Sequence, residues 1–508
     1  MVKTLWRPIC SDALILLLLT ILIRLPYFVP TVIHWHESTY TILGQDILNG
    51  HLPQTFYSEL KPPAAGLPYA LFILLFGKSI AAIRLGGALC IWLASVVINV
   101  ACRDRFGRLS AFLASISLII FATTENHAGC TMLEHIAILP LAFVVYLFAC
   151  REWTVNTFLR MGLAIGLAAM LKTNLAFFGL APLLMAFFKW KEFALDGVCK
   201  RSLALLAGIA IPQLVVVLIY FVTGNLDLWV QSSFVASFAS ASYQRGQFAQ
   251  RIPEVLQQIK GANLAAVFLC WALPIFNLIR VFRSSQDPDV ERKRERDFLL
   301  AMLACIICSF VTMLVPGVIH ARRYYLAMVP FTAAMAAPAF QYLQQHSKRS
   351  LCLCIVVCAF LISLLPVVSA YETALMYITG KKVDQEFEVA KYLNARSVKD
   401  HYVYFHAAHI GLWLTGAVSP TRFIHPTNMD KSDVLATLYV RPSTPKQELD
   451  EIFSKQPIYV VTRFRDGESQ EGEFTSGLDK KLKESYVLEK AIGNFGIFRS
   501  RLSLATEN

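Results

Sequence analysis

Long apolar runs recur along this chain, and they limit what it can fold into more than any other feature. Between Ala13 and Tyr371, one mostly apolar stretch follows another. Many of them reach the roughly 20 residues that an α-helix needs to cross the ~30 Å hydrocarbon core of a membrane. The mean hydropathy of +0.52 and the 16% of charged residues are far from the values of a soluble domain. We therefore expect a multi-pass membrane protein.

The apolar runs predict a polytopic, all-α membrane bundle of about eleven transmembrane helices over residues 1–371. Spans are expected to be helical because lipid offers no hydrogen-bond partners to the backbone. The first run lacks a small-residue cleavage site, so we interpret it as a retained span. The expected spans lie near residues 12–29, 80–101, 108–124, 133–150, 160–172, 174–188, 202–223, 262–280, 298–315, 324–340 and 351–370.

The basic residues between spans predict the orientation. With the N-terminus in the cytoplasm, most Lys and Arg residues before residue 371 fall on the cytoplasmic side, as the positive-inside rule requires. An odd number of spans then places residues 372–508 on the outer side, together with the long segments 34–80 and 224–261. We expect the chemistry of the protein on that outer face.

The polar tail, residues 372–508, is expected to form a small soluble α/β domain. Short β-rich runs at 402–405, 458–461 and 495–498 alternate with amphipathic stretches such as 383–396. All twelve cysteines precede this tail and most lie in apolar runs, so no disulfide framework is expected. The net charge of +12 follows the loops between spans, so we expect no nucleic-acid partner.

The first outer segment combines acid, imidazole and ammonium groups. His36 and Glu37 lie just past the end of the first span, and Lys61 precedes Pro62 and Pro63. A carboxylate or imidazole at this position is able to accept a proton from a substrate hydroxyl. The Lys61 ammonium is able to hold a lipid phosphate. The alternatives are solvated loop or helix-capping roles for His36 and Glu37, and an interfacial lysine reaching lipid headgroups.

Further charged groups lie where a membrane protein normally avoids them. His320, Arg322 and Arg323, followed by Tyr324, place positive charge at the outer end of two spans, which indicates an anion held there.

Three more charges fall within or beside apolar stretches. Lys172 and Arg84 must be paired or face a polar cavity, because an unpaired charge in lipid is costly. Glu134, next to His135, is expected to orient an acceptor or bind a metal, with a solvated loop as the alternative. His406 and His409 lack ligands at zinc spacing, and no nucleotide-binding glycine loop occurs. No cofactor is certain, and a divalent cation stays possible.

In their order along the chain, these motifs resemble those of the GT-C class of integral-membrane glycosyltransferases, in particular the branch of protein O-mannosyltransferases and bacterial lipid A aminoarabinose transferases. His36 and Glu37 stand where that family has an acidic pair, Lys61 and Pro62 match its Lys-Pro motif, and Arg84 with Leu85 matches its Arg-Leu pair. The stretch from Gly162 to Lys172, and Arg323 with the tyrosines that follow it, resemble two later motifs.

The resemblance implies inverting transfer of a sugar from a polyprenyl-phosphate donor to an acceptor such as lipid A, another glycan or a protein. It implies the outer face of a bacterial inner membrane, with the tail in the periplasm. The implied roles are catalytic base for Glu37 or His36; donor phosphate binding for Lys61, Arg322, Arg323 and His320; and substrate binding for Glu134, Lys172, Arg84 and Tyr324. The family's first acid is replaced here by His36, which leaves three alternatives: His36 acts as the base, Glu37 or Glu134 takes over that role, or the protein has lost transfer activity.

Two other functions stay open. A transporter would use Lys172, Arg84 and Arg322 to line a solute path between inverted repeats, but the hydropathy shows no repeat, and the long first outer segment and the outer domain argue against it. A catalytically inactive sugar-lipid binding protein is the other alternative.

Overall fold

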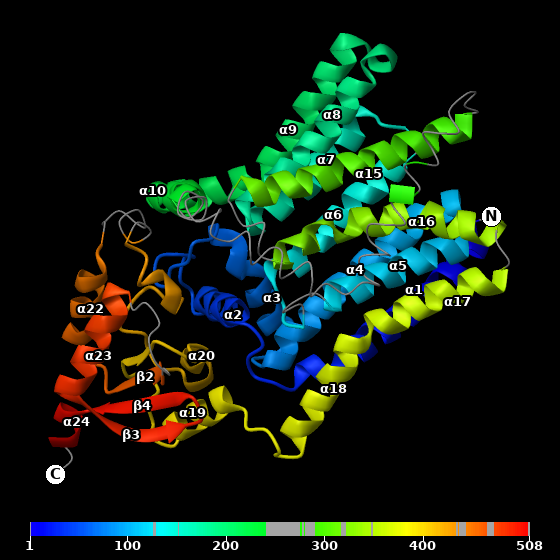
Figure 1. The fold of residues 1–508 in the computed structure, drawn as a ribbon. Helices are drawn as coiled ribbons and strands as arrows, with labels where there is room; N and C mark the ends of the chain where they lie inside the picture. The colour runs from blue at the N-terminus through cyan, green and yellow to red at the C-terminus, as the bar shows by residue number, and fades with distance from the viewer. Residues whose placement is uncertain are drawn as a thin grey trace. The chain divides into compact units, whose positions relative to one another are not determined.

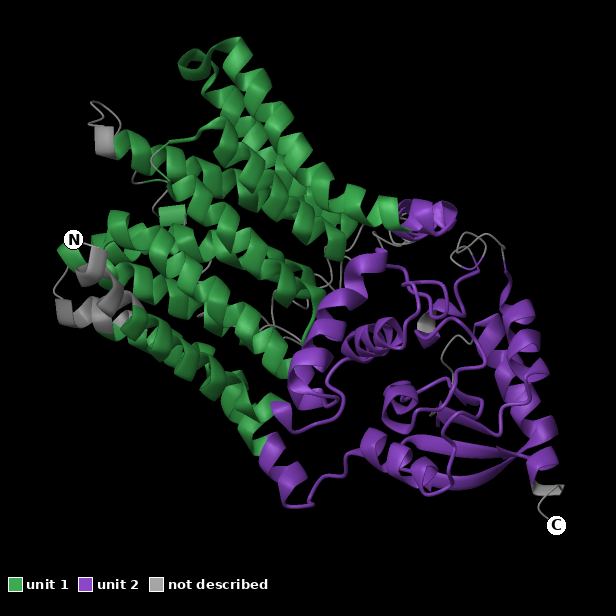
Figure 2. Ribbon diagram, turned by 180° about the vertical axis from the view of Figure 1, so that it is seen from behind, with its two compact units in different colours: residues 1–27, 84–219, 244–372 green, residues 28–83, 220–243, 373–508 purple. Residues whose placement is uncertain are grey.

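The computed structural model describes residues 2–124, 129–150, 152–239, 275–276, 279, 290–315, 322–346, 349–432, 435, 443–464 and 472–505. It divides the chain into two compact units, which Figure 2 colours separately. Unit 1 contains residues 1–27, 84–219 and 244–372. Unit 2 contains residues 28–83, 220–243 and 373–508. Each unit is assembled from segments that are distant in the sequence.

Unit 1 is a helical bundle, labelled in Figure 1. Its helices pack as neighbours in pairs that include α5 with α16, α6 with α7, and α8 with α15. They are α1 (Val2–Arg24), α4 (Ile80–Phe106), α5 (Arg108–Thr124), α6 (Leu133–Ala149), α7 (Val155–Leu171), α8 (Leu180–Phe188), α9 (Trp190–Val222), α15 (Val290–Leu314), α16 (Val329–His346), α17 (Arg349–Ser363) and α18 (Leu365–Ile378), with the 3₁₀ turns η3 (Thr173–Gly179) and η7 (Arg322–Met328).

Six helical segments in the described part of the chain are long and apolar enough to cross a membrane. They are Cys10–Phe28, Ile80–Phe106, Trp190–Val222, Arg292–Leu314, Arg323–Gln345 and Val357–Ile378. Shorter apolar helices occupy four more of the expected spans, such as α5 and α6. The expected span at 262–280 lies almost entirely outside the described residues. The multi-pass, mostly helical fold is thus confirmed, and the number eleven stays a prediction.

Charged and small residues hold the bundle together at specific points. The Asp12 carboxylate of α1 is buried and pairs with Arg103 of α4 at 3.0 Å and with Arg108 of α5 at 2.7 Å. Helices α7 and α9 approach closely at two glycines. A Cβ added to Gly162 would lie 2.2 Å from the Leu205 carbonyl oxygen, and one added to Gly208 would lie 2.3 Å from that of Leu159. Small residues at such crossings let helix backbones pack directly.

Unit 2 joins the segment 34–80 to the polar tail. The segment 34–80 holds α2 (Trp35–Leu48), η2 (Pro63–Gly66) and α3 (Leu67–Phe76), and α2 packs against both α3 and α20 (Ile410–Thr415) of the tail. Helix α2 is buried on nearly every face although it carries polar residues such as Glu37, Thr39 and Thr41. The short helix α10 (Leu226–Val230) also belongs to this unit.

The tail contains a four-stranded mixed sheet with the order β1-β2-β4-β3. Strands β1 (Val403–Phe405) and β2 (Tyr459–Arg463) are parallel, whereas β4 (Phe495–Ser500) pairs antiparallel with β2 and with β3 (Tyr486–Ile492). Helices α19 (Gln385–Asn394), α22 (Pro445–Ser454) and α23 (Glu473–Ser485) accompany the sheet, and α24 (Arg501–Ala505) follows it. The three expected β-runs and the expected amphipathic stretch all appear, and the small C-terminal sheet is confirmed.

Candidate functional site

The start of α2 places the first two candidate residues. His34 caps this helix: its Nδ1 accepts the backbone N–H of His36 at 3.2 Å, and its carbonyl accepts the N–H of Glu37 at 3.1 Å. Glu37 therefore lies in the first turn, where the helix dipole favours a carboxylate. Its exposure is only 2%, so it is not the solvated loop residue that the alternative assumed.

Four histidines gather around this helix start. The ring centroids of His34 and His36 lie 4.8 Å apart, and the His36 ring lies 5.0 Å from His425, which comes from the tail. The His425 ring lies 6.1 Å from His409, also from the tail. Trp35 stacks on His425 at 6.0 Å. The tail and the segment 34–80 therefore build this part of unit 2 jointly.

His409 is held as a neutral imidazole. Its Nε2 lies 3.1 Å from the carbonyl oxygen of Trp35 and 3.0 Å from Oγ1 of Thr39. Because a carbonyl only accepts, Nε2 must carry the proton. Burial, together with repulsion by His425, lowers the pKa of His409 to about 3. His409 thus anchors the tail to α2 without carrying a charge at neutral pH.

Lys61 stands outside any helix, two residues before η2, next to a buried acid. Its Nζ lies 3.9 Å from the carboxylate of Glu59 and donates to the Leu60 carbonyl at 3.0 Å. Gln54 fixes the segment, because it accepts the Glu59 N–H at 2.8 Å and donates to the Lys61 carbonyl at 2.9 Å. Burial raises the pKa of Glu59, while the charges of Lys61 and Lys431 act to lower it.

A cavity of about 400 Å³ opens within unit 2, beside the start of α2. It lies at the carboxyl ends of the parallel strands β1 and β2, which is the edge of a parallel sheet where ligands commonly bind. Its lining combines aromatic faces with hydrogen-bonding groups and includes Trp35, Ser38, His406, Asp430, Arg463 and Phe495. Neither Glu37 nor His36 is among the lining residues.

In unit 1, the structure brings four of the expected residues together. Glu134 lies in the first turn of α6, and its carboxylate pairs with the ammonium of Lys172, the residue that ends α7. The Lys172 Nζ lies 3.8 Å from the ring centroid of Tyr324, and the Arg323 guanidinium lies 5.3 Å from the same centroid. Of the two outcomes expected for Lys172, a paired charge or a polar cavity, the structure shows the pair. Glu134 is buried and is not a solvated loop residue.

Arg84 lies in the first turns of α4, within unit 1. It is fully buried and donates to the carbonyl of Tyr27. Arg24, equally buried, donates to the carbonyls of Gly129 at 3.1 Å and Cys130 at 3.2 Å. Both arginines thus hold backbone segments together. For Arg84, this structural role comes in addition to the substrate contact that the resemblance implies.

His135, the neighbour of Glu134, is satisfied by backbone alone. Its Nδ1 accepts the N–H of Met132 at 3.0 Å and its Nε2 donates to the Ala122 carbonyl at 2.9 Å. Both ring nitrogens are thereby used, so the ring fixes the start of α6. Within the described residues, no three His, Cys, Asp or Glu side chains come together to hold a metal ion.

Of the remaining expected residues, Arg322 begins η7 and His320 lies outside the described residues. Sequence reasoning missed Glu59, His34 and His425, and it assigned His409 no role. The proximity of Glu59 to Lys61 in the sequence was a usable signal. Nothing in the sequence alone brings residues 409 and 425 to residue 36.

One family model matches part of the chain. Residues 60–221 match the family described as dolichyl-phosphate-mannose-protein mannosyltransferase. The match includes Lys61, Arg84, Glu134 and Lys172 but neither Glu37 nor Arg323. A comparison with curated proteins gives no match.

Solved structures share the fold over nearly the whole chain. ArnT from Cupriavidus metallidurans in the apo state has a TM-score of 0.61 at 14% identity, covering 99% of both chains. The same protein bound to undecaprenyl phosphate has a TM-score of 0.60 at 12% identity, covering 98% of both. AglB, an oligosaccharyltransferase from Archaeoglobus fulgidus in complex with an inhibitory peptide and a dolichol-phosphate, has a TM-score of 0.52 at 12% identity, covering 98% of this chain and 75% of that one. The resemblance to the GT-C class is confirmed by the family model and by the fold.

Proposed function

We propose that this chain is a glycosyltransferase that moves a sugar from a polyprenyl-phosphate donor to an acceptor hydroxyl at the outer face of the membrane. The observation that carries the proposal is the fold shared with ArnT across 98% of both chains, because that relative was solved with undecaprenyl phosphate bound. AglB, solved with dolichol-phosphate, supports the same class of carrier. The proposal places the protein in a bacterial inner membrane, with the tail in the periplasm.

In unit 2, Glu37 is the proposed base. Its carboxylate takes the proton of the acceptor hydroxyl, the acceptor oxygen bonds to the anomeric carbon, and the bond between that carbon and the phosphate oxygen breaks with inversion. The electron pair leaves with polyprenyl phosphate, so the reaction needs no redox partner. We favour Glu37 over His36 as the base for two reasons. The His36 ring packs against the rings of His34 and His425. An ionised carboxylate only accepts hydrogen bonds, whereas a neutral imidazole carries a proton on one of its two nitrogens.

Cations are proposed to stabilise the charge that develops on the leaving phosphate. Lys61 serves this role in unit 2, and Arg323, with Arg322 and His320 beside it in the sequence, serves it in unit 1. Glu134, Lys172, Tyr324 and Arg84 are proposed to shape the substrate site of unit 1. The cavity beside α2 has a mixture of aromatic and polar groups that suits a sugar or glycan. Glu37 does not line it, but its neighbour Ser38 does, so the proposal requires the acceptor hydroxyl to reach from this cavity to the start of α2.

The experiment is reconstitution of the full chain in proteoliposomes with a radiolabelled polyprenyl-phosphate sugar and an extract of envelope glycolipids. We expect labelled sugar in the acceptor fraction and one polyprenyl phosphate released for each sugar transferred. Uptake of free solute without transfer would support a transporter instead. Tight donor binding without turnover would support the inactive binding protein.

A further inference from the structure

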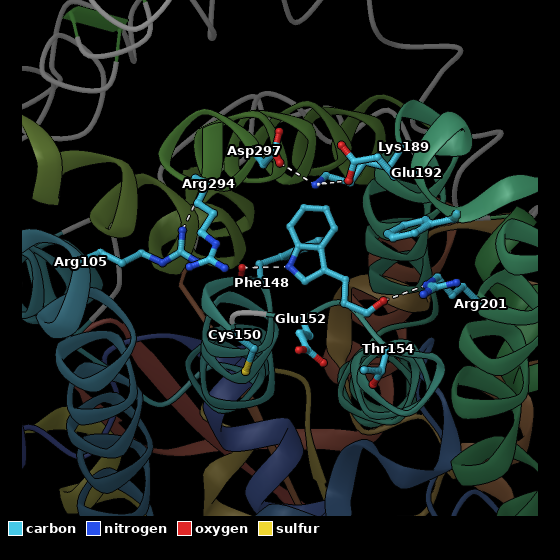
Figure 3. A pocket seen from close by; sticks show the side chains of 12 residues that line it. Arg105, Phe148, Cys150, Glu152, Thr154, Lys189, Glu192, Arg201, Arg294 and Asp297 are labelled. Carbon is cyan, nitrogen blue, oxygen red and sulfur yellow. Dashed lines mark hydrogen bonds and ion pairs between the residues drawn. The ribbon is translucent and has the colours of Figure 1, made fainter. Parts of the chain in front are cut away.

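A pocket of about 310 Å³ within unit 1 has no part in the proposed transfer. It is formed by the C-terminal ends of α4, α6 and α8, by the N-terminal parts of α7, α9 and α15, and by the segment between α6 and α7. Figure 3 shows Arg105 and Arg294 on one side and Arg201 on the other, with Glu152 between them. These residues come from the basic loops that the positive-inside rule assigns to the cytoplasm.

The acids that line the pocket are mostly neutralised by lysines. Asp297 accepts from the Lys189 ammonium at 2.6 Å. Glu192 accepts from Lys189 at 3.2 Å and from Lys293 at 2.7 Å. Glu152 is the remaining acid of the lining, and its side chain is exposed to water.

Two of the three arginines, in contrast, are held by backbone carbonyls. Arg105 donates to the carbonyls of Arg294 at 3.1 Å and Ala149 at 2.9 Å. Arg201 donates to the carbonyls of Trp153 at 2.8 Å and Gly197 at 3.0 Å. A carbonyl fixes a guanidinium in place but does not cancel its charge.

Aromatic rings support two of these guanidinium planes. Arg105 lies 5.3 Å from the ring centroid of Phe298, and Arg201 lies 3.8 Å from that of Phe193. In the part of the chain that the structure describes, no carboxylate forms an ion pair with Arg105, Arg201 or Arg294. The pocket therefore holds positioned positive charge in excess.

We infer that this pocket binds a phosphate group, supplied either by the headgroup of an anionic phospholipid or by free phosphate. Guanidinium groups match phosphate oxygens through planar forks of donors. Basic pockets between transmembrane helices on the cytoplasmic side are typical sites for anionic lipid headgroups. Thr154, which caps the N-terminus of α7, also lines the pocket, so the positive end of that helix dipole adds to the attraction.

The test is thermal unfolding of the full-length protein in detergent, titrated with phosphatidylglycerol in one series and with inorganic phosphate in another. We expect phosphatidylglycerol to raise the Tm of the wild type, and Arg201→Gln and Arg294→Gln each to raise the half-saturating concentration roughly tenfold or more. The Arg294 variant keeps the test sound, because Arg294 is exposed and its backbone carbonyl, not its side chain, accepts from Arg105.

Lys200→Gln is the matched control, because Lys200 is exposed, lies outside the pocket lining and changes the net charge equally. It is expected to respond like the wild type. Stabilisation by inorganic phosphate at the same concentrations would identify free phosphate as the ligand, and stabilisation by phosphatidylglycerol alone would identify a lipid. The inference is overturned if neither probe stabilises the wild type, or if Lys200→Gln weakens the response as much as Arg294→Gln does.

Discussion

Lys172 and Glu134 form a buried ion pair inside the helical bundle of unit 1. The side chains are 4% and 2% exposed, and they come from the end of α7 and the start of α6. The ammonium also lies over the Tyr324 ring. Each charge is tolerable among apolar helices because the other is present, since an uncompensated buried charge costs several kcal/mol.

Removing one partner of this pair is expected to destabilise the protein more than removing both. Lys172→Met leaves a buried carboxylate without its ion-pair partner, which costs roughly 3–5 kcal/mol. Glu134→Gln leaves the ammonium with the Tyr324 ring as partial compensation and costs less. In the double variant we expect most of the lost stability to return, as measured by thermal unfolding in a double-mutant cycle.

The sugar-transfer activity of the same double variant distinguishes a purely stabilising role of the ion pair from a role in substrate binding. If the pair also shapes the substrate site, the double variant recovers stability but not sugar transfer. Equal losses of stability in the double variant and in Lys172→Met would show that the two charges do not depend on each other.

The contact between α7 and α9 is expected to tolerate no side chain at its two glycines. Gly162→Ala and Gly208→Ala each place a methyl group less than 2.5 Å from a carbonyl oxygen of the facing helix. Overpacking of this kind typically costs about 1–3 kcal/mol. Thermal unfolding should show a clearly lowered Tm for both variants. Gly224→Ala is the comparison: its Cβ would meet no atom within 4 Å, so only the strain of a positive φ of 69° would act there. Unchanged unfolding of Gly162→Ala would contradict the close packing.

Unit 2 is expected to lose stability in acid through His409. The pKa of this buried imidazole is about 3, below its ordinary value of 6.5. Between pH 3 and pH 6.5, the unfolded chain therefore binds a proton at this position that the folded protein does not bind. The contribution is complete above about pH 6.5 and is lost as the pH falls, by at most about 1.4 kcal/mol per pH unit. His409→Gln keeps a donor for the Trp35 carbonyl and should flatten the dependence of Tm on pH between 6.5 and 4.

Glu59 acts in the opposite direction and serves as the control. Burial raises the pKa of its carboxyl, so the folded protein keeps a proton that the unfolded chain loses, and this contribution weakens as the pH rises. Glu59→Gln should therefore make the Tm fall more steeply as the pH is lowered, whereas His409→Gln should make it fall less steeply. A wild-type Tm independent of pH in this range, with both variants like it, would speak against a neutral buried His409.

Lys61 is expected to act on donor affinity. Lys61→Ala should raise the KM for the polyprenyl-phosphate sugar roughly 10- to 100-fold, the loss expected for one hydrogen bond to a charged group. Lys61→Arg should recover part of it, because the charge is kept. Lys446→Ala, at an exposed position of α22, is the control and should leave KM unchanged. A KM unchanged by Lys61→Ala would remove Lys61 from the phosphate site.

The sequence predicts the elements of this fold better than it predicts their partners. Apolar length indicates the helices, and β-rich runs indicate three strands, because both signals are local. Strand β3 is not predicted because it lies at the edge of the sheet, where most of its side chains are exposed, and because it carries Glu489 and Lys490. Helix α2 is not predicted because the sequence of a short helix with polar residues on its buried faces resembles that of a loop.

The candidate site shows the same division. The charge of Lys172 within an apolar stretch predicts that it has an ion-pair partner. Only the packing of α6 against α7 identifies Glu134 as that partner. His409 and His425 reach α2 through tertiary contacts across more than 300 residues of sequence. No periodicity or spacing encodes such a contact, so the histidine cluster becomes visible only in the folded protein.

The proposed sugar transfer depends most on a carboxylate at position 37 that accepts the proton of the acceptor. The direct measurement is kcat for sugar transfer from a polyprenyl-phosphate donor by Glu37→Gln, beside His36→Asn and the wild type, with thermal unfolding to confirm that each variant is folded. We predict a loss of roughly 100-fold or more for Glu37→Gln, the range of general-base catalysis, and a loss below about tenfold for His36→Asn. A folded Glu37→Gln protein that transfers sugar at the wild-type rate would contradict the proposed role of Glu37 as the base.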